Sequence, residues 1–253
     1  MKRQEGTTLK SSRKFRCGSW FTIVGLLVAT GIEAFVLSGI GSVVSHPVQA
    51  ASGSEGMAGG KVLPPRAKPH GISLAAMAKL TAVFNSGDHS GTPPASPIQM
   101  LYTSATNNNT FDVNTGTTFY VPVIFFDDSP PIAGDFPYAA FGEDSEESGG
   151  RAALLNYVNG ENELGVDSME IKVDGKVFSL GSDYVVGVTT DPLADGGGTH
   201  YIPIAAFISP LAKGSHTVEL DGFSDGKALI PFFPPNGAWS FQITYTVNVH
   251  GDE

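Results

Sequence analysis

The sequence is poor in cysteine and in basic residues. Among its 253 residues it has one cysteine, and 15 Lys and Arg stand against 25 Asp and Glu, which gives a formal charge of −10. A single thiol excludes a disulfide scaffold. Charged residues make up only 16% and apolar residues 41%, which excludes a disordered tail. The 31 Gly and 17 Pro are too few for collagen or low-complexity sequence, and they suit a fold with many turns.

The chain has one long apolar run, residues 21–44, and basic residues precede it. The order of basic, apolar and small residues is typical of a secretory signal. We predict a signal peptide over 1–50 with cleavage after Ala50, and hence a protein that is secreted or at the cell surface. An uncleaved membrane anchor is the alternative, because the run is long enough to span a bilayer, although Glu33 in its middle disfavours insertion. The basic residues in question are Lys2, Arg3, Lys10, Arg13, Lys14 and Arg16.

Removal of residues 1–50 makes the chain more acidic. Six basic and two acidic residues leave with this segment, so 203 residues remain with 9 basic and 23 acidic side chains and a charge of −14. Because such a surface repels phosphate groups, we expect no nucleic-acid partner and no binding to an anionic membrane surface. Cys17 also leaves, which excludes disulfides, a cysteine nucleophile and thiolate metal sites.

Three regions follow the predicted signal. Residues 51–69 are rich in Gly, Ser and Pro and read as a flexible linker. Residues 70–97 contain a helix and a loop that we expect to pack on the next domain, with Ser73 as the N-cap and Gly87 at the end. The apolar stripe of this helix comprises Leu74, Met77, Ala78, Thr81 and Phe84. Residues 98–253 form the third region, which reads as a β domain.

Short strand-like segments separated by turns fill residues 98–253. The segment 117–126 is apolar on both faces, as a central strand would be, and Pro122 implies a bulge. Asp174-Gly175-Lys176 between 169–173 and 177–180 predicts a hairpin. Further strands are expected at 184–189, 200–207, 215–220 and 241–249, the last with strict alternation. The sequence therefore predicts a mainly β fold, an antiparallel β-sandwich of about 7–10 strands with one short N-terminal amphipathic helix.

Three of these segments carry a resemblance. Asp174-Gly175-Lys176-Val177, the run 210–218 and the alternating segment 241–249 resemble phrases found in a loose group of exported bacterial β-sandwich proteins of unassigned function. The resemblance would cover residues 70–250. It implies export and an all-β domain, and it brings no catalytic or binding residue with it.

Carboxylates are the reactive groups present in number. Calcium needs six to eight oxygen ligands on loops that can fold around it, and acidic loops rich in glycine supply them. Structural calcium is therefore the one cofactor that the sequence suggests, although no acidic run has the spacing of the helix-loop-helix calcium motif. The alternative is that these loops are solvated and keep an exported protein soluble. The candidate ligands are Asp127, Asp128, Asp191, Asp195, Asp221 and Asp225.

Other catalytic constellations find little support. No two histidines of 51–253 lie within four residues of each other, and we considered only His200 and His216 as a pair that might meet on neighbouring strands. There is no Gly-x-Ser-x-Gly elbow in that region, no phosphate-binding loop and no dinucleotide fingerprint. We therefore assign no catalytic and no cofactor-binding residue. A binding protein is a better match to this sequence than an enzyme.

Three functions stay open at this point. The first is an exported non-catalytic β-sandwich that serves as a binding module or as part of a surface or extracellular assembly, with a protein partner at an edge strand or a glycan as its ligand. Aromatic residues for a glycan surface would be Tyr138, Tyr157, Tyr184, Tyr201 and Trp239. The second is an extracellular glycoside hydrolase that uses carboxylates, and the third is a strand-exchanging fibre subunit.

Overall fold

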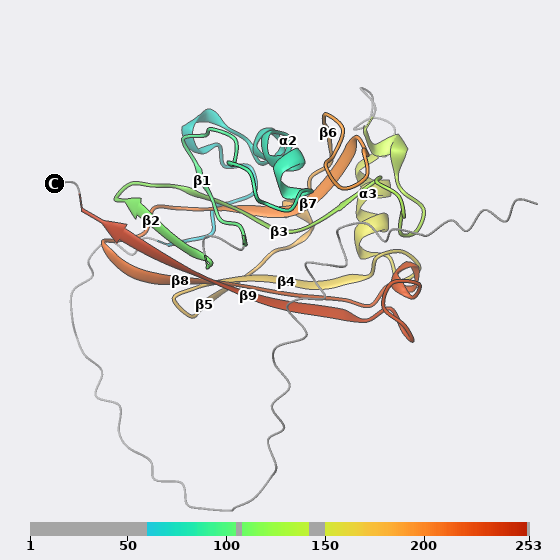
Figure 1. Cartoon of the computed structure of the whole chain (residues 1–253). Helices are drawn as coiled ribbons and strands as arrows, with labels where there is room; N and C mark the ends of the chain where they lie inside the picture. Colours follow the sequence, from blue (N-terminus) through green and yellow to red (C-terminus); the bar gives the residue numbers. More distant parts are fainter. Residues whose placement is uncertain (1–59, 105–107, 142–149, 252–253) are drawn as a thin grey trace, which may run out of the picture. The chain divides into compact units, whose positions relative to one another are not determined.

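The structure is a computed structural model that describes residues 60–104, 108–141 and 150–251 (Figure 1). The predicted signal peptide, its cleavage site after Ala50 and residues 51–59 of the predicted linker lie outside the described residues.

The described residues are mainly β, as the sequence predicted, and their strands form two sheets. The four-stranded sheet has the order β1-β3-β7-β6, and the five-stranded sheet has the order β2-β9-β8-β4-β5. The strands are β1 (Gln99–Met100), β2 (Thr110–Asn114), β3 (Phe119–Asp127), β4 (Val166–Val173), β5 (Lys176–Ser179), β6 (Val188–Thr189), β7 (His200–Ile208), β8 (Gly214–Ser224) and β9 (Trp239–His250). The helices are α2 (Leu74–Asn85) and α3 (Gly150–Asn159), with 3₁₀ turns η1 (Pro69–Gly71), η2 (Tyr138–Phe141), η3 (Ser182–Tyr184) and η4 (Lys227–Leu229).

The sheets are mixed, which corrects the expectation of purely antiparallel pairing. β1 runs parallel to β3, and β2 runs parallel to β9, while the other pairs are antiparallel. A parallel pair requires a crossover connection rather than a tight turn. The chain between β1 and β3 meets this requirement because it contains β2, which belongs to the other sheet.

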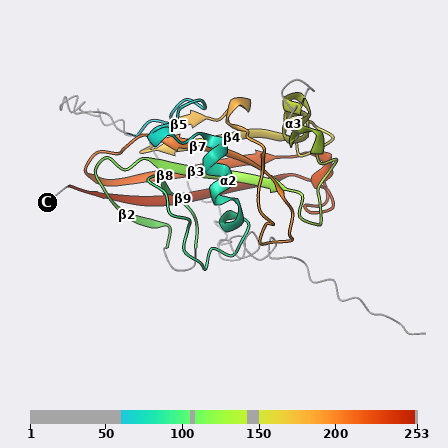
Figure 2. The same cartoon turned by 90° about the horizontal axis from the view of Figure 1, so that it is seen from above.

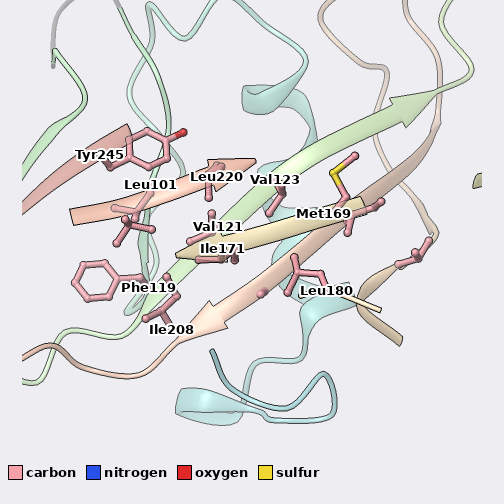
Figure 3. Close-up of a cluster of buried hydrophobic side chains, with 14 of the residues drawn as sticks. Leu101, Phe119, Val121, Val123, Met169, Ile171, Leu180, Ile208, Leu220 and Tyr245 are labelled. Carbon is pink, nitrogen blue, oxygen red and sulfur yellow. The ribbon is translucent and has the colours of Figure 1, made fainter. Parts of the chain in front are cut away.

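The two sheets share one apolar core. Its side chains come from β3 and β7 of the smaller sheet and from β4, β8 and β9 of the larger one (Figure 3). Residues of the opposite parity on β3 and β7, such as Tyr120 and Phe207, pack instead against α2, which lies over this sheet (Figure 2). β3 and β7 are therefore covered on both faces, which explains why the sequence of β3 is apolar without alternation.

Both prolines in the central strands occupy positions where a missing N–H group does little harm. The register between β3 and β7 shifts between Pro122 and Ile124, which confirms the predicted bulge. Pro203 lies within β7 without interrupting it. Its carbonyl accepts a hydrogen bond from the backbone N–H of Val186, on the side of β7 that faces away from β3. Its missing N–H therefore faces the short β6 side of the sheet, where little pairing is lost.

Helix α2 follows the prediction closely. The Ser73 side chain accepts a hydrogen bond from the backbone N–H of Ala76, so this residue is the N-cap. Of the predicted stripe, Leu74, Met77, Ala78 and Thr81 are buried, and Phe84 is partly buried against the same side of the sheet.

The expectation of a single helix was wrong, because α3 is a second one of ten residues. Leu154, Tyr157 and Val158 have the spacing of one helix face and are buried in the shared core. Arg151 in its first turn donates to the backbone carbonyls of Val185 and Ser182, which ties the helix to the segment before β6. Among the described helices, none is both long enough and apolar enough to cross a membrane.

The predicted segment 184–189 contains less strand than we expected. Only Val188–Thr189 forms β6, because residues 182–184 turn as η3. The hairpin at Asp174-Gly175 is confirmed, and both residues have positive φ angles (49° and 78°).

We expect the core of the two sheets to dominate stability. Leu220 is fully buried between them, whereas Leu80 on the outer side of α2 is 44% exposed. Leu220→Ala should lower the free energy of unfolding by about 2–5 kcal/mol because it leaves a cavity, and Leu80→Ala should change it by less than about 0.5 kcal/mol. Urea denaturation of both variants measures the difference, and equal losses would contradict the placement of this core.

Candidate functional site

A cluster of polar side chains joins the end of β3 to the start of β7. These strands are antiparallel neighbours with Asp127 opposite Tyr201, so the residues after β3 lie beside the loop 190–199 that precedes β7. Asp127, Asp128 and Ser129 come from the first segment, and Asp195 and His200 come from the second.

Asp127 is the carboxylate most perturbed by its surroundings. Its Oδ1 accepts a hydrogen bond from the backbone N–H of Ser129 (2.7 Å), while its Oδ2 is buried and has no hydrogen-bond partner among the described residues. Burial, together with the negative charge of Asp195, raises the pKa of Asp127 to about 7. Near neutral pH this side chain therefore carries a proton in a substantial share of molecules.

Ser129 connects the two segments through its hydroxyl group. Its Oγ donates to Asp195 Oδ1 (2.9 Å) and accepts from the backbone N–H of Gly198 (3.2 Å). The loop passes so close that a β-carbon at Gly196 or Gly198 would lie less than 3 Å from atoms of Ser129. Glycine at these positions is thus required by the close approach of the loop.

Asp128 holds the start of β7 through three hydrogen bonds. Its Oδ1 accepts from the backbone N–H groups of Thr199 (2.7 Å) and His200 (2.9 Å), and its Oδ2 lies 2.7 Å from Nδ1 of His200. Burial alone would raise the pKa of Asp128, but the hydrogen bonds from His200 and Thr199 outweigh it and lower the pKa. Asp127 and Asp128 are adjacent in sequence, yet their surroundings shift their pKa values in opposite directions.

Aromatic rings surround the His200 imidazole. The Phe141 ring lies 4.7 Å away and the Tyr138 ring 5.4 Å away, both edge to face, and Phe136 follows at 6.2 Å. Tyr138 is half exposed (51%), whereas Phe136 is buried. The imidazole therefore contacts three aromatic rings and is also held by Asp128.

The six predicted calcium ligands do not converge on one point. Asp127, Asp128 and Asp195 belong to the cluster just described, and Asp191 is exposed on the same loop. Asp221 lies on β8 in the other sheet, where it pairs with Lys172 (2.8 Å), and Asp225 is exposed just after β8. Within the described part of the chain, no group of three or more His, Cys, Asp or Glu side chains is arranged to hold a metal ion. Calcium binding stays a prediction.

The predicted pair of histidines and the predicted aromatic surface do not form as expected. His200 starts β7 and His216 lies on β8, so they belong to different sheets, and each has its own aspartate partner. Tyr157 and Tyr201 are buried, and Tyr184 donates its hydroxyl proton to the Leu63 carbonyl. Of the five aromatic residues considered for a glycan surface, Tyr138 is the most exposed.

Sequence reasoning missed Ser129 and the Asp128–His200 pair. The signal that was available is the run Asp127-Asp128-Ser129 directly after an apolar strand, together with the Gly196-Gly197-Gly198 triplet before the next one. What the sequence did not show is that these two segments would face each other, because that depends on the pairing of β3 with β7.

We expect Asp127→Asn to stabilise the protein at pH 8 but not at pH 4. The carboxyl has a pKa of about 7 when folded and about 3.9 when unfolded, so the unfolded state loses its proton first and stability falls as pH rises between these values. An amide has no proton to lose, so the variant should lack this decline. Thermal melting from pH 4 to pH 8 tests the prediction. Asp191→Asn on the facing loop 190–199 is the matched control and should decline as the unmodified protein does.

No family model matches the chain, and neither does any curated protein or solved structure.

Proposed function

We propose that this protein is an exported β-sandwich that acts by binding and assembly at the cell surface or outside the cell, without catalysis. The shared core of the two sheets supports the sandwich, and the sequence of residues 1–50 supports export. The observation that carries the proposal concerns the segment 60–63. This segment precedes the rest of the fold in sequence and forms backbone hydrogen bonds along the end of β7.

This segment is bonded to β7 much as a short strand would be. Val62 lies opposite Ile208, and two backbone hydrogen bonds flank the pair, from Leu63 to Phe207 (2.8 Å) and from Ser209 to Lys61 (2.9 Å). β6 pairs only with the first two residues of β7, so the segment covers an edge that β6 leaves open. We predicted a flexible linker over 51–69, but its residues 60–63 are bonded to the end of β7 and to the residues that follow it.

The side chains of the segment add to both apolar clusters. Val62 packs against the core between the sheets, and Leu63 packs against the cluster under α2. Gly60 fits against Leu211 and Val173 so closely that a β-carbon there would lie within 3 Å of both. The fold therefore gains specific packing from four residues near its amino-terminal end.

A second copy of the chain offers the same four residues. If its segment took this place, the hydrogen bonds and contacts of residues 60–63 themselves would be kept, so the exchange would cost bonding only in the hinge that follows residue 63. We therefore propose strand exchange between copies as the mode of assembly. The excess of acidic side chains continues to disfavour nucleic acid and anionic membranes as partners.

Hydrolysis by carboxylates is the second candidate, and Asp127 beside Asp195 is the observation that favours it. A carboxyl group whose pKa is raised to about 7 by burial and by a neighbouring carboxylate suits acid catalysis. The burial of Asp127 Oδ2 opposes this role, because a substrate must reach the acidic oxygen. Turnover on a panel of glycans that is lost in Asp127→Asn and kept in Asp191→Asn would establish the hydrolase.

Cysteines at positions 62 and 208 test the exchange of the segment. In the background Cys17→Ser no other thiol is present, and the flanking hydrogen bonds make Val62 and Ile208 a non-hydrogen-bonded pair, which has the short Cα separation that a disulfide needs. With exchange, oxidised Val62→Cys/Ile208→Cys should give dimers and longer species on a non-reducing gel.

Val185→Cys/Ile204→Cys is the matched control. This pair bridges to the same strand β7 but lies within the body of the fold, so its disulfide should link residues of one chain only. Cross-links confined to single chains in both variants, together with sedimentation as a monomer at all protein concentrations, would contradict the assembly.

A further inference from the structure

Beside the segment 60–63, a histidine ties two turns together. His216 near the start of β8 reaches the turn between β4 and β5, where its Nδ1 lies 2.7 Å from Asp174 Oδ2. It also reaches the turn that precedes β8, where its Nε2 lies 2.8 Å from the Ala212 carbonyl oxygen. The ring thus bridges two segments that are 38 residues apart in sequence.

Both partners of the imidazole are acceptors. A neutral imidazole has one N–H group and one bare nitrogen, so it can satisfy only one of the two oxygens. The imidazolium has two N–H groups and satisfies both, and it also pairs with the charge of Asp174. The geometry therefore selects the protonated ring.

The turn 209–212, which the His216 ring contacts at Ala212, also holds the segment 60–63. Gly60 donates to the Pro210 carbonyl (3.2 Å), Ser209 donates to the Lys61 carbonyl, and Gly60 packs against Leu211. These three partners immediately precede Ala212, the residue whose carbonyl the His216 ring holds. On the other side, Asp174 also accepts from the backbone N–H of Thr217 (3.0 Å), which fixes the β4–β5 turn to β8.

We propose that His216 is a pH-dependent clamp that holds the segment 60–63 in its own chain when protonated and loosens it when neutral. This inference names the regulation of the exchange proposed above and rests on it for its biological consequence. Loss of the proton removes one of the two hydrogen bonds, frees the turn 209–212 and makes the segment easier to exchange.

The charges around the ring are few. The β4–β5 turn presents Asp174, the turn before β8 presents the Ala212 carbonyl and carries Lys213, and β9 presents Val247 opposite His216. Burial acts to lower the pKa of His216, but the hydrogen bond to Asp174, the Ala212 carbonyl and the charge of Asp174 outweigh it, so the pKa is raised. The clamp is then fully closed below the ordinary pKa of histidine, about 6.5, and opens as pH rises through the higher folded value.

Amide hydrogen exchange tests the clamp without reference to assembly. We expect protection of the hydrogen-bonded amides of Gly60, Lys61, Leu63 and Ser209, corrected for intrinsic exchange rates, to fall several-fold between pH 6 and pH 8.5. His216→Gln should show the low protection at both pH values. Asp174→Asn is the second variant, because asparagine tolerates the positive φ angle at this position (49°) while it removes the charge, and it should weaken the pH dependence.

His250→Gln is the matched control. His250 lies at the same end of the sheet, since its neighbour Val249 pairs with Gly214, and it also pairs with an aspartate, Asp112 (3.1 Å), but both side chains are largely exposed and this aspartate belongs to β2 rather than to the turns that His216 joins, so this variant should behave as the unmodified protein does. Protection that is independent of pH in the unmodified protein, or an unchanged pH dependence in His216→Gln, would overturn the clamp.

The cysteine pair 62/208 provides the second readout. The measured quantity is the fraction of 62/208 disulfides that join two chains, divided by the oxidation yield of the pair 185/204 at the same pH. This ratio should rise from pH 6 to pH 8.5 in the unmodified background, and it should be high at both pH values with His216→Gln. If interchain links never form while the protection still depends on His216, the clamp stands and the strand exchange fails.

Discussion

Two strands, β3 and β7, are covered on both faces, and most of the fold depends on this constraint. One face packs on the larger sheet and the other packs on α2, so nearly every side chain of β7 is buried. A strand in this position cannot shift its register by one residue without exchanging two sets of fitted side chains. The ends of β3 and β7 are consequently held at fixed positions, and the loops that leave them meet in a defined way.

The polar cluster follows from this register. Asp127 stands opposite Tyr201, which places Asp128 and Ser129 against the backbone of 198–200. Asp127 and Asp128 accept hydrogen bonds from backbone N–H groups, and Asp195 accepts one from the Ser129 hydroxyl. Asp128 also pairs with a side chain that can carry a positive charge, that of His200. The cluster therefore works first as a fastening between two loops, and the buried Asp127 proton is a consequence of that fastening.

The sequence was sufficient where a feature depends on local pattern and insufficient where it depends on distant contacts. The helix capped by Ser73, the hairpin at Asp174-Gly175 and the bulge at Pro122 could be predicted from neighbouring residues alone. The parallel pairing of β1 with β3 and of β2 with β9 could not be predicted in this way. It depends on the chain crossing from one sheet to the other after Met100, which neighbouring residues do not reveal. In the same way, the acidic residues could be found in the sequence. That Asp127, Asp128 and Asp195 would lie at one sheet and Asp221 at the other could not be predicted from it.

An acidic chain with little positive charge has to use its carboxylates differently from a balanced one. Asp128, Asp174 and Glu163 each accept from the backbone N–H of a residue far along the chain, at Thr199, Thr217 and Asp135. Such bonds join loops without lysine or arginine, and they also stand in for the disulfides that a chain without thiols after residue 50 cannot form. Where a histidine joins such a carboxylate, as His216 joins Asp174, the fastening becomes sensitive to pH near neutrality. The position of that one histidine, beside the segment that completes β7, is what links the acidic character of the chain to its proposed assembly.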